Sequence, residues 1–193
     1  TDGDGDGNNT DIDIDGDGAS NVDELAYGFD PFTARYANHQ IIAGKFHTCV
    51  IDDNGVKCWG HNTDGQTNVP VLSNPTQVDA GGLHSCAMHD SGVECWGSTG
   101  YGQSTVPALT NPTQVSAGFY HSCAIHDDGA ECWGSSTAGE INVPELGNLK
   151  MISSVSSHTC TLDDARVTCW GDSYYGQTVV PALTNPTQVS AGN

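Results

Sequence analysis

The sequence has few basic residues and no long apolar run. It holds 5 Lys and Arg against 24 Asp and Glu, which gives a formal net charge of −19. This balance disfavours nucleic acid and anionic membrane surfaces as partners and favours divalent cations. No stretch approaches the roughly 20 apolar residues that a helix needs to cross a bilayer, so we expect no membrane insertion. No secretory leader is visible, and we interpret the chain as a mature or trimmed segment.

A unit of 37 residues repeats four times and begins a fifth time. The copies begin at Ala43, Ala80, Ala117 and Ser154, and the truncated fifth begins at Ala191. The first copy reads AGKFHTCVIDDNGVKCWGHNTDGQTNVPVLSNPTQVD. All four Trp and half of the His keep the same period. A period of 20 to 50 residues is typical of solenoids and propellers, in which each unit buries its apolar face against its neighbours.

The eight cysteines form four pairs with eight residues between partners. Three pairs flank a turn that ends in Gly55, Gly92 or Gly129, whereas the fourth has Asp164-Ala165-Arg166 and lacks the glycine. Partners equally far from a hairpin tip lie side by side across two strands, within reach of a disulfide. Buried reduced thiols and zinc sites are the alternatives, but the short Cys-x-x-Cys spacing of zinc ribbons is absent. The expected disulfides join Cys49 to Cys58, Cys86 to Cys95, Cys123 to Cys132 and Cys160 to Cys169.

Four such disulfides predict a protein that is exported from the reducing cytosol and is secreted or displayed at the cell surface. Each copy is expected to form four short strands: one along Gln-Val, two in the hairpin, and one near Val-Pro, as at Val106-Pro107. Four-stranded units repeated radially are propeller blades. The sequence therefore predicts an all-β, β-propeller-like array of four blades, preceded by a short calcium loop and helix.

The repeat pattern AG-x-x-HSCA-x-x-DG-x-ECWG-x-x-x-x-GQ-x-x-VP resembles the regulator of chromosome condensation repeat, in its short disulfide-bearing bacterial form. The resemblance covers about 150 residues and implies a propeller, typically of seven blades, that acts as a protein-binding platform. It implies no shared catalytic residue, and the repeats bring no Ser, His and Asp together off the common pattern. We expect a protein that is not an enzyme.

The acidic leader, residues 1–36, contains a twelve-residue calcium loop at positions 13–24. A hard cation takes six to eight oxygen ligands, and alternate carboxylates on a tightly curled loop converge on one point. The expected ligands are Asp13, Asp15, Asp17, the Ala19 carbonyl, Asn21 and Glu24, with Gly18 at the sharp turn. An earlier run with Asp2, Asp4 and Asp6 offers a second site, and a disordered linker is the alternative because no hydrophobic helix start follows it. A short helix is expected over 20–27, and the leader resembles thrombospondin type 3 calcium repeats, which act as calcium-ordered spacers in secreted proteins.

The residues that vary within the fixed frame of the repeats, 37–193, are the candidates for partner binding. They fall in the two positions before each period-matched His and in the loop after each Cys-Trp-Gly. The expected anchors are Phe46, Leu83, Tyr101, Phe119, Tyr120, Tyr174 and Tyr175. The His at 47, 84, 121 and 158 are expected to hydrogen-bond a backbone group between blades rather than to form a ring of metal ligands.

Four repeats are fewer than the seven typical of the resembled family. A fragment of a longer array, a closed ring of four blades and subunits joined head to tail all remain open. The sequence thus predicts an exported calcium-binding structural or adhesive protein, such as a subunit of an extracellular fibre. The alternative is a soluble, inhibitor-like module that recognises a partner protein through its variable face.

Overall fold

A computed structural model describes residues 40–164 and 166–192 of the chain, all within the compact unit Asn38–Asn193. The expected calcium ligands, the second acidic run and the helix over 20–27 lie outside the described residues. The described part holds strands and no helix, and so no helix that could span a membrane. The strands are β1 (Gln40–Ala43), β2 (His47–Asp52), β3 (Gly55–Gly60), β4 (Gln77–Ala80), β5 (His84–His89), β6 (Gly92–Gly97), β7 (Gln114–Ala117), β8 (His121–His126), β9 (Gly129–Gly134), β10 (Leu149–Val155), β11 (His158–Asp163) and β12 (Val167–Gly171).

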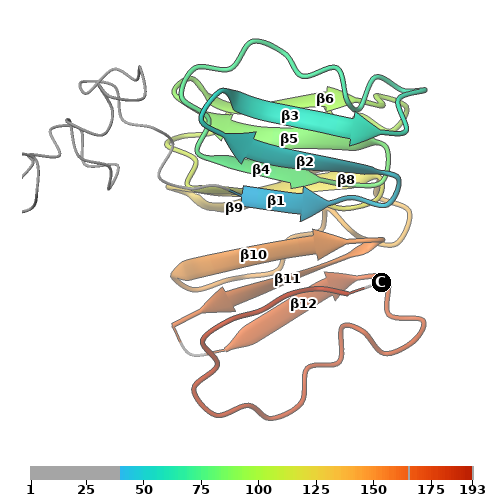
Figure 1. Cartoon of the computed structure of the whole chain (residues 1–193). Helices are drawn as coiled ribbons and strands as arrows, with labels where there is room; N and C mark the ends of the chain where they lie inside the picture. Colours follow the sequence, from blue (N-terminus) through green and yellow to red (C-terminus); the bar gives the residue numbers. More distant parts are fainter. Residues whose placement is uncertain (1–39, 165, 193) are drawn as a thin grey trace, which may run out of the picture. The chain divides into compact units, whose positions relative to one another are not determined.

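The strands form four antiparallel sheets of three strands each, which we name blades 1 to 4 in chain order (Figure 1). In every blade an inner strand pairs with the first arm of a hairpin, and the first arm pairs with the second. The two cysteines of each hairpin lie directly opposite one another, as Cys86 lies opposite Cys95. All four expected disulfides are formed, and no described cysteine is free. The all-β fold, the hairpins and the disulfide pairing are therefore confirmed.

The prediction of a fourth strand in each blade is wrong. The segment after Cys-Trp-Gly makes a turn and then runs through Val-Pro without joining a sheet, as at Val106-Pro107. Proline has no backbone N–H to donate to a strand ladder, which weakens a segment that would lie at the sheet edge. The segment instead covers the space between blades, where Val106 and Leu109 pack on the core between blades 2 and 3.

The turns explain why particular residues recur. Gly55, Gly92 and Gly129 close their hairpins with φ values of 96°, 109° and 117°, a conformation that glycine adopts without a steric penalty. The fourth hairpin forms without a glycine. Its ends are joined by a hydrogen bond from the Asp163 N–H to the Arg166 carbonyl, and the Asp163 carboxylate accepts the Arg166 N–H.

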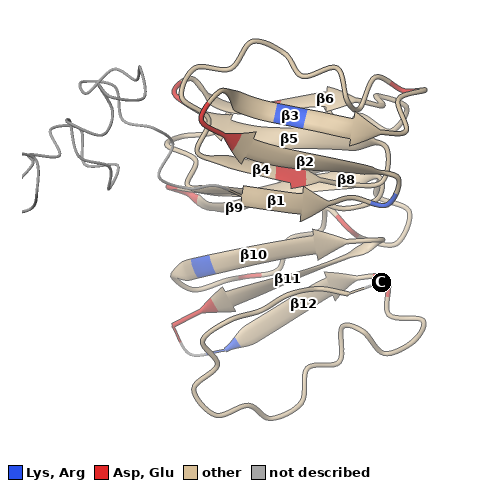
Figure 2. Cartoon of the chain, viewed as in Figure 1, with Lys and Arg blue, Asp and Glu red and all other residues tan. Residues whose placement is uncertain are grey.

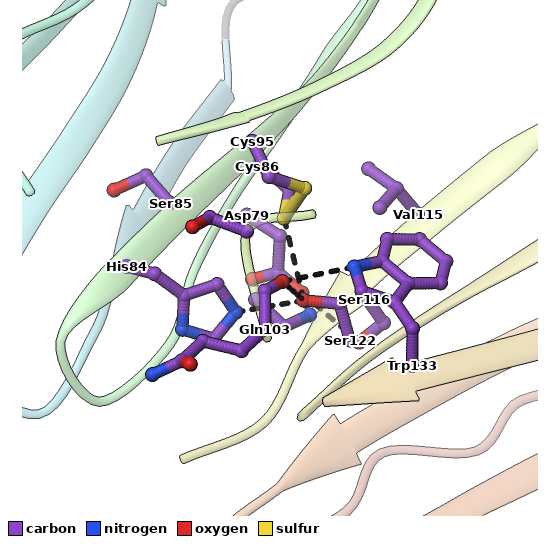
Figure 3. The surroundings of a disulfide bond; sticks show 12 residues. Asp79, His84, Ser85, Cys86, Cys95, Gln103, Val115, Ser116, Ser122 and Trp133 are labelled. Atoms are coloured by element: carbon purple, nitrogen blue, oxygen red, sulfur yellow. Dashed lines mark hydrogen bonds between the residues drawn. A yellow bond between two sulfur atoms is a disulfide. The ribbon is translucent and has the colours of Figure 1, made fainter. Parts of the chain in front are cut away.

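A shared set of contacts joins each blade to the next, and Figure 3 shows it between blades 2 and 3. The Trp133 ring packs on the Cys86–Cys95 disulfide of the preceding blade, and its Nε1 donates to the Gln103 carbonyl at 2.9 Å. Trp96 and Trp170 donate to carbonyls in the same way, at 2.9 and 2.8 Å. The expected role of Trp in the packing core is confirmed for these three, each 7–8% exposed.

The inner strands are joined by side chains that bridge to the backbone of the next blade. The Oε1 atoms of Gln40, Gln77 and Gln114 each accept a backbone N–H there at 2.9 to 3.0 Å. These bridges explain why Gln recurs at the start of the inner strand. Asp79 acts similarly: its carboxylate accepts the Ser116 hydroxyl and the Ala117 N–H, both at 2.9 Å. Burial raises the pKa of Asp79, and these hydrogen bonds lower it in part.

Candidate protein-binding face

The two variable segments of each repeat meet at one end of the blades. The residue after each Cys-Trp-Gly donates its backbone N–H to the carbonyl of the residue that precedes the period-matched His. His61 bonds Phe46 in this way, and Ser135 bonds Tyr120, at 2.9 and 2.8 Å. The same bond joins Ser98 to Leu83 and Asp172 to Ser157. The structure thus gathers the expected variable positions on one rim, which we call the aromatic rim.

The largest aromatic cluster of this rim lies on blades 2 and 3, with Lys45 of blade 1 beside it. The Tyr120 ring lies 4.7 Å from the Tyr101 ring and 4.2 Å from the Phe119 ring, between centroids. Lys45 Nζ lies 4.3 Å from the Phe119 centroid, within cation–π distance. Tyr101 is 53% exposed, and the rings of Phe119 and Tyr120 are partly buried. The cluster offers solvent a firmly packed aromatic surface with one cation beside it.

The other expected anchors are on the same rim but not all in this cluster. Phe46 is half-exposed and contacts His61, with ring centroids 5.9 Å apart. Leu83 is partly buried. Tyr174 and Tyr175 form a separate pair on blade 4, with ring centroids 4.8 Å apart and both rings more than 80% exposed.

The recurring Gly-Gln pair holds the loops of the rim in place, a role that the sequence analysis missed. Gly102 has a φ of 79°, and Gln103 is fully buried behind it. The Gln103 side-chain oxygen accepts the Tyr101 N–H at 2.9 Å, while its backbone carbonyl accepts Trp133 of the next blade. Gln66 and Gln177 hold their loops through the same side-chain bond, as does Glu140 in blade 3. The recurrence of Gly-Gln beside a variable loop in three of the four copies, with Gly-Glu in the third, was the signal for this role.

The period-matched histidines support the rim from beneath. His84 Nε2 and the Ser122 hydroxyl are 2.7 Å apart, and that hydroxyl donates to the Gln103 carbonyl. The His84 ring therefore donates from Nε2, because the single hydroxyl proton is already used. His47 and His121 bond Ser85 and Thr159 alike, at 2.7 and 2.8 Å. These partners are hydroxyls and not the backbone groups that we expected.

Burial keeps these imidazoles neutral. Loss of solvent lowers the pKa of His84 to about 3, helped by the neighbouring histidines, and that of His121 to about 4. Burial also lowers the pKa values of His47 and His158. The described residues hold no group of three or more side chains that could bind a metal ion.

The opposite ends of the blades are acidic. Figure 2 shows acidic residues at the tips of β2 and β11, at the other end of the strands from the connection that carries Lys45. The acidic residues at these hairpin turns are Asp52, Asp53, Asp90, Asp127, Asp128, Asp163 and Asp164. Lys57, Lys150 and Arg166 form ion pairs with Asp52, Asp164 and Asp163 on this rim. The array thus presents one aromatic rim and, at the other end of the strands, one rim with more acidic than basic residues, which we call the acidic rim.

A cleft of about 560 Å³ runs along the inner strands and is lined by Gln40, Gln77, Gln114 and Gln188. The side chains of the first three already bridge to neighbouring blades. The cleft brings together no nucleophile, base and orienting group of the kind that catalysis requires. The aromatic rim is therefore the better candidate site.

The fold and the rim together define a class: blades of a β-propeller whose variable loops lie on a rigid, repeated frame. Two segments, residues 39–66 and 113–140, match the family model described as regulator of chromosome condensation (RCC1) repeat. Two of the four repeats, the first and the third, therefore contain segments that are similar to the RCC1 repeat. A comparison with curated proteins found no match.

Solved structures show the same fold. The ectodomain of the receptor kinase CR4 from Physcomitrella patens is 27% identical, with a TM-score of 0.59, over 69% of this chain and 41% of that chain. The CRINKLY WD40 ectodomain of ACR4 from Arabidopsis thaliana is 25% identical, with a TM-score of 0.56, over 69% of this chain and 49% of that chain. Prp20p from Saccharomyces cerevisiae is 18% identical, with a TM-score of 0.61, over 74% of this chain and 45% of that chain. The chain thus spans less than half the length of each.

Proposed function

We propose that this chain is an extracellular repeat module that acts by binding a partner protein through its aromatic rim, and that it has no catalytic activity. The observation that carries the proposal is the packed cluster of Tyr101, Phe119 and Tyr120, which lies at variable positions of an otherwise repeated frame. Aromatic side chains are enriched among residues that dominate binding energy, because they bury a large area with little loss of conformational freedom.

Rigidity of the frame supports the same proposal. The loop that carries Tyr101 is fixed by Gln103, and Tyr120 is fixed by its backbone bond to Ser135. A surface that is already ordered loses little entropy on binding. Among the similar structures, Prp20p is described by its binding to Gsp1p and histones, so a propeller of this type serves as a protein-binding platform in that case.

The extracellular location rests on the four disulfides, which persist in oxidising compartments. Two of the similar structures are receptor-kinase ectodomains. This supports a module that works outside the cell.

Loss of two rings from the rim tests the binding proposal. Three proteins are immobilised and exposed to secreted and cell-surface proteins from the source. They are the wild-type chain, the double variant Tyr101→Ser/Tyr120→Ser, and the matched control Asp90→Asn/Asp127→Asn on the acidic rim. We expect a partner protein that the wild type and the control retain and that the rim variant loses. Its affinity for the rim variant should be at least about 30-fold lower than for the wild type. Retention by the rim variant and loss from the control would assign binding to the acidic rim instead.

Calcium binding by the leader is a separate part of the proposal. The loop at 13–24 supplies Asp13, Asp15, Asp17 and Glu24 at the spacing that calcium loops use. Titration calorimetry of the full chain should show binding of calcium that Glu24→Gln weakens strongly, because it removes the bidentate carboxylate. The control Glu94→Gln, on β6, should bind calcium as the wild type does. Equal heats for wild type and Glu24→Gln would refute the site.

A second candidate function is a structural subunit of an extracellular fibre or surface assembly. One observation favours it: Trp59 on blade 1 is 51% exposed, whereas the other three Trp are buried between blades. Blade 1 therefore presents half of a contact that the chain completes three times elsewhere.

A further inference from the structure

Lys45 differs from the other basic residues that the structure describes. Three of these form ion pairs with aspartates on the acidic rim, and they are Lys57, Lys150 and Arg166. Lys45 lies instead on the aromatic rim, where it is exposed and pairs with no carboxylate of residues 40–164 and 166–192. Its Nζ lies 4.3 Å from the centroid of the Phe119 ring and 5.2 Å from that of Phe46. The ammonium group therefore has rings beside it and N–H donors that the described part of the chain leaves to a ligand.

The backbone of the aromatic rim and one glycine fix where this cation lies. Lys45, Gly82 and Phe119 occupy the same position in blades 1, 2 and 3, and the N–H of each donates to a carbonyl of the next blade at 3.1, 3.1 and 2.8 Å. The Phe119 ring fills the space above Gly82, because a Cβ on Gly82 would come within 2.6 Å of a ring carbon. A residue without a side chain at position 82 thus lets the Phe119 ring extend from blade 3 across blade 2 to Lys45 on blade 1.

The rim around Lys45 carries few charges. Residues 82–83, 98–101, 119–120 and 135–138 form the rim of blades 2 and 3 and contain no acidic or basic residue. Glu140 follows them but is 1% exposed, and its carboxylate accepts the Ala138 N–H and two hydroxyls of its own loop. Asp64, on the blade 1 loop, is exposed and forms no described ion pair with Lys45. A single cation thus lies beside the ring cluster, on a chain whose net charge is −19.

We infer that the aromatic rim binds a protein segment that carries one Asp or Glu next to an aromatic or aliphatic side chain, and this rests on the proposed function. The carboxylate accepts hydrogen bonds from Lys45 Nζ, and the apolar side chain packs on Phe119 and Tyr120. A ring face beside an ammonium group excludes water from that side. The ion pair with a carboxylate is therefore screened less than an ion pair in open solvent.

The charge of the whole chain limits what surrounds that carboxylate. A net charge of −19 repels a partner surface that is rich in acids and favours one that is neutral or basic overall. One carboxylate within such a surface meets Lys45. A Lys or Arg at the same place in a competing segment would face Lys45 with the same charge, so the contact also selects against wrong partners.

Selection of random peptides displayed on phage tests the inference with a defined set of probes. The immobilised wild-type chain should enrich peptides in which Asp or Glu lies next to an aromatic or aliphatic residue. Lys45→Glu should enrich Lys or Arg at that place, because the charge on the rim is reversed. Lys45→Met should keep the apolar preference and lose the preference for an acid. The Lys45 side chain is exposed, so each variant should fold, and its thermal midpoint checks this.

The affinity of one selected peptide measures the contact. Lys45→Met should weaken binding about fivefold, as should Asn or Gln in place of the peptide's acid, and both changes together should cost no more than either alone. Lys57→Met is the matched control, because it makes the same change in net charge on the acidic rim, and it should bind as the wild type does. A wild-type selection without enrichment of acids would overturn the inference. Equal affinity of wild type and Lys45→Met, or equal weakening by Lys57→Met, would do the same.

The rim variant Tyr101→Ser/Tyr120→Ser separates this inference from the proposed function. Peptides that depend on these two rings but not on Lys45 would remove the carboxylate contact and leave the binding proposal standing. Peptides that depend on Lys45 but not on the rings would keep the contact and refute the ring cluster as the binding surface. If the wild type retains no peptide, the inference falls, and the capture of a partner decides the binding proposal alone.

Discussion

Acidification should unfold the blade array by protonating histidines that the fold keeps neutral. His84 and His121 have pKa values of about 3 and about 4 in the folded protein, against 6.5 for an unperturbed side chain. Below pH 6.5 the unfolded chain binds protons at both sites while the folded chain does not. The stability that these sites contribute is therefore present above pH 6.5 and is lost as the pH falls toward their folded pKa values.

The structure supplies the cause. His84 donates from Nε2 to the Ser122 hydroxyl, which leaves Nδ1 unprotonated and without a hydrogen-bond partner among the described residues. Protonation of Nδ1 would bury a charged N–H against Gly81 with nothing to accept it. At pH 5 each site should cost about 2 kcal/mol of stability relative to neutral pH, or about 4 kcal/mol for the two together.

Urea unfolding of the repeats at pH 7, 6 and 5 measures this loss. The double variant His84→Gln/His121→Gln keeps a side-chain donor at both places. Between pH 6.5 and 5, its unfolding should take up about two fewer protons than that of the wild type, so its stability should depend less on pH. Asp79 works in the opposite direction, because burial raises its pKa and the folded state takes up its proton first on acidification. It is present in both proteins and cancels in the comparison. The same pH dependence in wild type and double variant would refute the reasoning.

Three further predictions concern the frame. Gly81→Ala should lower the thermal midpoint sharply, because a Cβ there would come within 2.3 Å of the Gly118 carbonyl oxygen and 2.7 Å of the His84 ring. Gly100→Ala, with no atom nearer than 4.0 Å, should change it little, and equal shifts would show that the packing around Gly81 is not tight. Trp133→Phe should cost about 1 kcal/mol or more in urea unfolding, because it leaves the Gln103 carbonyl without its donor, and Trp59→Phe is the matched control with almost no cost. Replacing Cys86 and Cys95 together by Ala should cost roughly 2–3 kcal/mol in the same assay, and an unchanged midpoint would mean that this disulfide adds no stability.

Much of the frame followed from the sequence because each copy repeats the same local signals. Equal spacing of Cys49 and Cys58 around a turn was sufficient to predict a hairpin and its disulfide, since cross-strand partners must lie opposite each other. The fourth strand was predicted wrongly because Val106-Pro107 looks extended, but an extended segment forms a strand only when a neighbour is there to pair with it. That neighbour depends on the tertiary structure and not on the local pattern.

The rim was predicted only in part, for a related reason. Variation inside a repeated frame identified Tyr101, Phe119 and Tyr120, and the structure brings these three together. The sequence did not reveal that Gln103 fixes their loop while its carbonyl binds the next blade, because both bonds join residues far apart in the chain. The hydroxyl partners of the histidines were missed on the same grounds, as each lies 38 residues away.

Hydrogen–deuterium exchange of the chain with and without its captured partner tests the proposed function most directly. The partner should slow exchange in residues 98–103 and 119–121, which carry the aromatic cluster, and should leave the acidic hairpin turns at 90–92 and 127–129 unchanged. Protection of those turns with no change at the aromatic rim would contradict the account.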